Sequence, residues 1–270
     1  MNNHNNSDFP TCFAHPGKPS DIEQVISVHQ QAVDLTPCDH PNKHRYLNNL
    51  GNSFLTRFEY LGELGELSDL QRALSNHRDA VNLIPGGHPD RLTCLNNLAI
   101  SSLAHFKRFG ELSVLEQAIS SLEETVGLLP DDNPDTPACL NNLGNSLVFR
   151  FERLGELSDL EQAISRLREA LNLLSDDHPD TPTYLNNLGN VVVTRFERLG
   201  ELSDLEDATL ILRNAVDLTP RGHPHKPHFL ESLGNAIVTR FEHFGEPSDL
   251  EDAILILEDA ADLAIQGPHH

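Results

Sequence analysis

Residues 185–206 read LNNLGNVVVTRFERLGELSDLE, and this stretch recurs along the chain at a nearly constant interval. Two copies share FERLGELSDLE verbatim, at 151–161 and 196–206. The LNNL-type string begins at Leu47, Leu95, Leu140, Leu185 and Leu230. A serine motif follows in the same register, at Ser20, Ser68, Ser113, Ser158, Ser203 and Ser248. The unit is therefore about 45 residues long, and self-similarity at such a period is typical of stacked repeats.

Each unit contains two helical patterns. Apolar residues from Leu185 to Leu199 recur with the 3.6-residue period of one helix face, and Gly200 is expected to end that helix. The second helix is expected to begin at Ser203, with Glu206 completing a capping box. Thr181 is expected to be the N-cap of the first helix, before Pro182 in its first turn.

These patterns predict an all-α protein with a single helix at about 21–36 followed by five antiparallel helix pairs. The predicted solenoid spans 20–266, between a disordered tail at 1–19 and a short C-terminal tail at 267–270. Its units are expected at about 41–86, 89–131, 134–176, 179–221 and 224–266.

The residues within each helix resemble the tetratricopeptide signature. Leu185, Leu188-Gly189 and Val192 match the large, large-small, large positions of its first helix. Ala208, Leu212, Ala215 and Pro220 match the second helix and the following loop. The unit is longer than the family's usual length of about 34 residues. With H-P-D before L-N-N-L, it resembles the kinesin-light-chain type and acidic fungal arrays that flank caspase-like (CHAT) proteases or signalling NTPases.

The resemblance implies a right-handed α/α superhelix whose first helices line a concave groove. On those helices, the face opposite the apolar one carries asparagines and then an apolar residue in each unit. The expected peptide-binding residues are Asn48, Asn52, Asn96, Asn141, Asn145, Asn186, Asn190, Asn235, Leu55, Leu103, Val148, Val193 and Val238. An amide can both donate to and accept from a peptide backbone. The alternative is that the asparagines only cap, bridge or solvate the inner wall.

Repeated arginines precede Phe-Glu in four units: Arg57, Arg150, Arg195 and Arg240. We expect them to pair with acids of the Glu-Leu-Ser-Asp turn, and a phosphate or carboxylate clamp is the alternative.

The cluster His223, His225 and His228 is the one uneven histidine group, but it lacks an obvious fourth ligand. We therefore predict no metal site and no cofactor. The four cysteines lie far apart in the sequence and suggest packing, not disulfides.

The net charge of -22 argues against nucleic acid and an anionic membrane as partners, because such binders rely on Lys and Arg. No apolar stretch is long enough to span a membrane, and the first residues lack a signal-peptide pattern, so we expect a cytoplasmic protein. Phosphate-binding, metalloprotease and serine-hydrolase motifs are absent from the sequence.

These observations predict a non-enzymatic scaffold or adaptor that binds a peptide or helical segment of a partner protein, favoured where the segment is basic. The alternative is a regulatory module that self-associates end to end or acts through its ends on a separate protease or NTPase. We expect Leu255, Leu257 and Leu263 of the last helix to be partly uncovered, which is the reason for this alternative.

Overall fold

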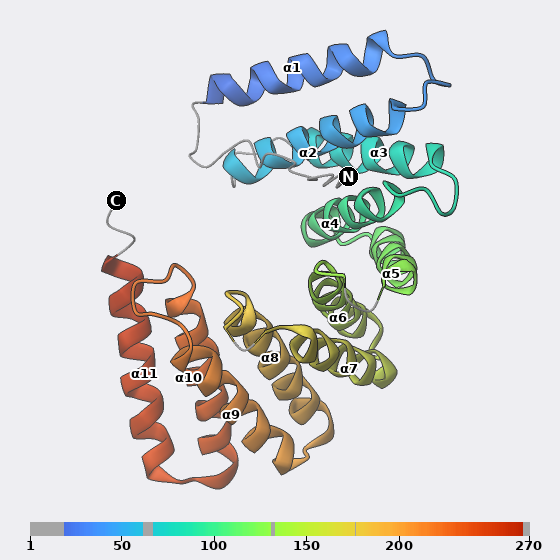
Figure 1. Cartoon of the computed structure of the whole chain (residues 1–270). Helices are drawn as coiled ribbons and strands as arrows, with labels where there is room; N and C mark the ends of the chain where they lie inside the picture. Colours follow the sequence, from blue (N-terminus) through green and yellow to red (C-terminus); the bar gives the residue numbers. More distant parts are fainter. Residues whose placement is uncertain (1–18, 62–66, 131–132, 176, 267–270) are drawn as a thin grey trace, which may run out of the picture. The chain divides into compact units, whose positions relative to one another are not determined.

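The structure is a computed structural model that describes residues 19–61, 67–130, 133–175 and 177–266. Eleven α-helices account for most of these residues, and no strand occurs among them. The predicted tail at 1–19 lies outside the described residues except for Pro19, and so does the predicted tail at 267–270. The all-α prediction is confirmed (Figure 1).

The chain divides into two compact units, at residues 1–114 and 115–270. The helices of the first unit are α1 (Pro19–Leu35), α2 (Lys43–Leu61), α3 (Leu67–Leu83) and α4 (Arg91–Phe109). Helix α5 (Leu112–Leu128) belongs almost entirely to the second unit. It is followed there by α6 (Thr136–Leu154), α7 (Leu157–Leu173), α8 (Thr181–Leu199), α9 (Leu202–Asp217), α10 (Lys226–Phe244) and α11 (Pro247–Gln266).

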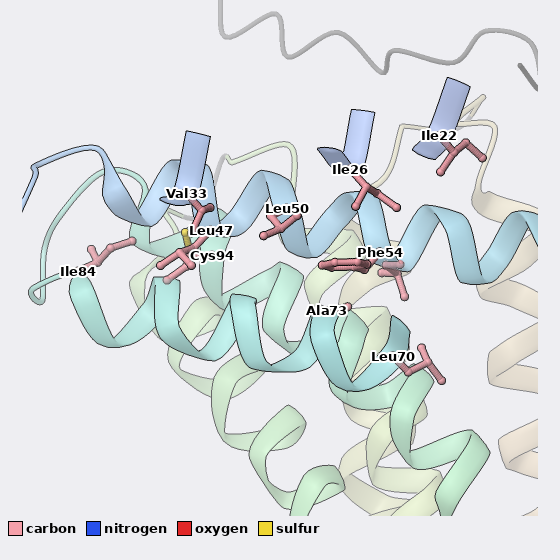
Figure 2. Close-up of a cluster of buried hydrophobic side chains, with 12 residues drawn as sticks. Ile22, Ile26, Val33, Leu47, Leu50, Phe54, Leu70, Ala73, Ile84 and Cys94 are labelled. Carbon is pink, nitrogen blue, oxygen red and sulfur yellow. The ribbon is translucent and has the colours of Figure 1, made fainter. Parts of the chain in front are cut away.

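The core of the first unit forms where α1, α2 and α3 present their apolar faces to one another. Figure 2 shows Ile22, Ile26 and Val33 of α1 pointing toward α2, where Phe54 and Leu50 are each only 2% exposed. Burying such side chains contributes about 1.5–3 kcal/mol each. In the second unit, each helix from α6 to α11 contacts the next along the chain, and α8 also contacts α6 and α10. The first helices of successive repeats therefore lie side by side.

A glycine lets the two helices of a pair approach closely. A Cβ built on Gly189 of α8 would lie 2.5 Å from Cγ of Leu212 in α9, and one on Gly144 would lie 2.7 Å from Cγ of Leu167. Such distances are far inside van der Waals contact, so a side chain there would require the facing leucine to move. The small-residue position of the repeat is thus occupied for a packing reason.

The observed C-terminal end of the first helix agrees with the sequence-based prediction, whereas the observed N-cap residues do not. Gly200 ends α8 with φ 72°, and its N–H donates to the carbonyl of Phe196 over 2.7 Å, as predicted. The predicted serine cap is wrong, because α9 begins at Leu202 and its N-cap residue is Glu201. The predicted threonine cap is wrong too, since Asp180 occupies the N-cap of α8 and Thr181 is its first residue.

A basic residue at the start of a first helix takes over a capping role that the sequence does not reveal. Nζ of Lys226 donates to the carbonyls of Val216 (2.6 Å) and Thr219 (2.9 Å), at the end of the preceding helix. Lys43 and Arg91 do the same in the first unit. Cations at helix C-termini are favourable because the free carbonyls carry partial negative charge.

Candidate functional site

The first asparagine of the LNN string lies between repeats. Asn48, Asn141 and Asn186 are buried, with exposures of 7%, 8% and 2%. Nδ2 of Asn97 donates to Oδ1 of Asn48 over 3.0 Å, and Nδ2 of Asn187 donates to Oδ1 of Asn141 over 2.9 Å. Amide-to-amide hydrogen bonds thus tie successive first helices together.

The second asparagine of the string supplies these donors, although it is not among the expected peptide-binding residues. Its repetition at 49, 97, 142 and 187 was the available signal. Ser232 stands at this position in the last unit, and its Oγ lies 3.4 Å from Nδ2 of Asn190. Oδ1 of Asn186 is buried and has no hydrogen-bond partner among the described residues. A serine side chain is too short to replace the missing amide donor.

The remaining predicted groove residues are more accessible. Asn52, Asn96, Asn145 and Asn190 are half-buried, and Asn235 is exposed. The apolar positions Leu103, Val148, Val193 and Val238 are half-buried, whereas Leu55 is buried in the core of the first unit. The structure therefore divides the predicted set into inter-repeat residues and residues that another molecule can reach.

The second unit brings the reachable residues into register on three neighbouring helices. Equivalent positions of α6, α8 and α10 carry an asparagine (Asn145, Asn190, Asn235), a valine (Val148, Val193, Val238) and an exposed glutamate (Glu152, Glu197, Glu242). Helix α8 contacts both α6 and α10. We call these nine residues the Asn-Val-Glu face. The first unit lacks the uniform acidic row, because Lys107 stands where Glu59 stands one repeat earlier.

The repeated arginines are structural, as predicted. Nε and Nη2 of Arg195 donate to the two carboxylate oxygens of Asp204 over 2.8 and 2.6 Å. Hydrogen bonding to Asp204 raises the pKa of Arg195 above its ordinary value. The same bidentate pair joins Arg57 to Asp69, Arg150 to Asp159 and Arg240 to Asp249. Nε and Nη2 of each arginine are thus already bonded to an aspartate of the same helix pair. This disfavours the alternative that the arginines bind the phosphate or carboxylate of a ligand.

His223, His225 and His228 do not form a metal-binding group among the described residues. Nδ1 of His223 accepts the backbone N–H of His225 over 3.2 Å, and their ring centroids are 5.5 Å apart. Within the described part of the chain, the one group of His, Cys, Asp or Glu side chains close enough to share an ion is His44, His88 and Asp90.

Two of the cysteines are packing residues. Cys94 and Cys139 are each 2% exposed, and burial raises the pKa of these thiols to about 12 and about 11. A thiol held in this state is a weak nucleophile at neutral pH. Cys38 is exposed, and Cys12 lies outside the described residues.

The family follows from the repeat itself. The model of the tetratricopeptide repeat matches residues 91–135 and 138–180. The matched segments are tetratricopeptide repeats, and the same sequence motifs recur in the array of units on either side of them. Proteins of this fold serve in general as protein-interaction scaffolds. No curated protein matches the array.

No helix among the described residues has the length and apolar character required to cross a membrane.

Solved structures share the fold over nearly their whole length. BtubC (BKLC) from P. vanneervenii matches with a TM-score of 0.61 at 17% identity, covering 92% of the array and 94% of that chain. A kinesin-light-chain-like protein of Podosopora anserina with nearly identical TPR-like repeats matches with 0.55 at 17% identity, covering 84% and 97%. YrrB, a TPR protein with an unusual peptide-binding site, matches with 0.51 at 14% identity, covering 88% and 93%. The array thus has the kinesin-light-chain type of fold.

Proposed function

We propose that the array is a non-enzymatic scaffold that binds an extended or helical segment of a partner protein on the Asn-Val-Glu face. The observation that carries this proposal is the register of asparagine, valine and glutamate across α6, α8 and α10. The similarity to YrrB, a TPR protein with a peptide-binding site, supports a peptide as the ligand.

The three rows supply different parts of recognition. The amides of Asn145, Asn190 and Asn235 can each donate to and accept from a peptide backbone, which requires no particular side chain on the ligand. The valines offer half-buried apolar contacts. The glutamates and the net charge of -22 favour a basic segment and oppose nucleic acid.

The test is a peptide-display selection on the full chain, followed by affinity measurements on the selected peptides. The first variant replaces Asn145, Asn190 and Asn235 by Ala; all three side chains are accessible, so the core is left intact. The matched control replaces the exposed asparagines Asn82 and Asn214 of second helices by Ala.

We expect the triple variant to bind selected peptides at least about tenfold more weakly, since each lost amide contact costs about 0.5–1.5 kcal/mol. The control should bind like the wild type. A second variant, Glu152→Gln/Glu197→Gln/Glu242→Gln, should weaken the binding of basic peptides only and should reduce the salt dependence of binding. Equal peptide affinity of the wild type and the triple alanine variant would refute the proposal.

A second candidate function, self-association or regulation of a separate protease or NTPase through the ends, is favoured by the exposed apolar residues of α11. Ile254 and Leu255 are 48% and 65% exposed, whereas Leu257 and Leu263 are half-buried. Leu255 is exposed like its equivalent Leu210 in α9 (61%) and is therefore not specific to the last helix. Ile254 is exposed although its equivalents Ile164 and Thr209 are buried, so Ile254 is the residue to change. A second copy of the chain is the proposed occupant. The mass in solution should then rise with concentration, and Ile254→Glu should abolish that rise; a monomer at all concentrations would contradict it.

A further inference from the structure

His44 interrupts the pattern of the repeats. The equivalent position, three residues before the LNNL-type string, is occupied by Leu92, Pro137, Pro182 and Pro227 in the other units. His44 is nevertheless 4% exposed and lies in the first turn of α2. A buried imidazole at an otherwise apolar position needs polar partners, because leaving it unpaired costs free energy.

Its partners come from the loop between α3 and α4, more than forty residues along the chain. Nε2 of His44 lies 2.8 Å from Oδ2 of Asp90. The rings of His44 and His88 meet edge to face, with centroids 5.1 Å apart. His44, His88 and Asp90 each offer one ligand atom, and these atoms all lie within 4.8 Å of one another. All three residues belong to the first unit.

We propose that His44, His88 and Asp90 form a binding site for a divalent ion of the zinc type. Two imidazoles and one carboxylate suit Zn²⁺, Co²⁺ and Ni²⁺, whose sites often combine three protein ligands with water. Zinc–ligand bonds of about 2.0–2.1 Å place neighbouring ligands about 3.4 Å apart in a tetrahedron. Small side-chain rotations therefore suffice to close the site around an ion.

A cavity with polar and apolar lining residues gives an ion access to the carboxylate of Asp90. Its volume is about 260 Å³, and its lining includes Asp90, Arg45, Asn49 and Thr93. A water molecule occupies about 30 Å³ in the liquid, so the cavity has room for water ligands. The site thus combines one buried and one half-buried imidazole with an entry path to its carboxylate, which a metal site requires.

Arg45 competes with an ion for the carboxylate. Its Nε lies 2.5 Å from Oδ2 of Asp90, and its Nη2 lies 3.1 Å from Oδ1. The Arg45 side chain is 54% exposed, so the guanidinium can move into solvent when an ion takes its place. Arg45→Ala should therefore tighten metal binding by removing both the competing donor and its charge. A purely structural network of His44, Asp90 and Arg45 predicts no such gain.

A bound ion would link the first turn of α2 to the α3–α4 loop. It would stabilise the first unit by mass action, because the unfolded chain does not hold the three ligands together. This role is independent of the Asn-Val-Glu face, which lies in the second unit.

The experiment is a titration of the full chain with Zn²⁺ and Co²⁺, with affinities determined by competition against a chelator. His44→Leu removes one ligand and restores the residue type of Leu92. Asp90→Asn is the second variant, because it preserves the side-chain shape if the first variant fails to fold. The control replaces His223, His225 and His228 by Gln and thereby removes the exposed histidine cluster.

We expect both ligand variants to bind roughly tenfold or more weakly, since even an outer-shell partner of a metal is worth about 10–100-fold. The control should bind like the wild type, and Arg45→Ala should bind several-fold more tightly. Equal affinities of wild type and His44→Leu, or loss of binding only in the control, would overturn the proposal. A thiolate charge-transfer band in the Co²⁺ spectrum would also overturn it, by placing the ion on a cysteine.

Discussion

Replacing His77 by leucine should make the first unit of the array less sensitive to acid. His77 of α3 is 0% exposed, and its Nδ1 and Nε2 lie 3.0 Å from Oγ of Ser101 and 3.1 Å from Oδ1 of Asn52. Burial lowers the pKa of His77 from 6.5 to about 4. Leucine occupies the equivalent position in every later repeat, at 122, 167, 212 and 257. The fold therefore accommodates the substitution.

The sign and size of the effect follow from this pKa. In the unfolded chain His77 takes up a proton as the pH falls below about 6.5, but in the folded chain it resists until about pH 4. Above pH 6.5 the neutral His77 does not lower the stability of the fold. As the pH falls from 6.5 to 4, the free energy of unfolding decreases progressively, because the unfolded chain binds a proton that the folded chain excludes. Integration over the two titrations gives a loss of about 2 kcal/mol between pH 7 and pH 5.

The assay is urea unfolding of the full chain, followed by circular dichroism at pH 7 and at pH 5. Wild type should lose about 2 kcal/mol more stability between the two pH values than His77→Leu does. His228→Gln is the control, because it removes a histidine whose side chain is 62% exposed instead of buried. Equal losses in wild type and His77→Leu would refute the reasoning and show that the folded protein protonates His77 without penalty.

Three further predictions concern the packing of the repeats. Gly189→Ala should lower the melting temperature and cost about 1–3 kcal/mol, because its Cβ would overlap the leucine opposite; Gly86→Ala, with open space around it, should be neutral. Asp204→Ala should destabilise the second unit by about 2–3 kcal/mol in urea unfolding, since it leaves the Arg195 guanidinium, 19% exposed, without its carboxylate. Thr181→Lys should raise stability by about 0.5–1 kcal/mol by reproducing the basic cap that Lys226 provides in the next repeat. Oγ1 of Thr181 is buried and lacks a hydrogen-bond partner among the described residues. An unchanged melting temperature in the glycine or aspartate variant, or a lowered one in the lysine variant, would contradict these packing roles.

Local periodicity was sufficient to predict much of this fold. The spacing of LNNLGN and ELSDLE predicted two helices per unit, and the glycine after the first helix predicted its C-terminus. The pairing of Arg195 with Asp204 was also predictable, because the two residues are nine apart across a single tight turn. The helix N-termini were not, since Glu201 and Asp180 occupy the N-cap positions that the sequence motifs assigned to Ser203 and Thr181.

The sequence by itself determined the repeat length, the all-α class and which residues share a helix face, because these depend on interactions between residues close along the chain. The burial of Asn186 and the convergence of His44 with Asp90 were decided only by the tertiary structure. Such contacts join residues about one repeat apart along the chain. Which residues meet depends on how one helix pair is rotated against the next. A rotation of that kind leaves no periodic mark in the sequence, although it separates the residues that a ligand can reach from those that hold the repeats together.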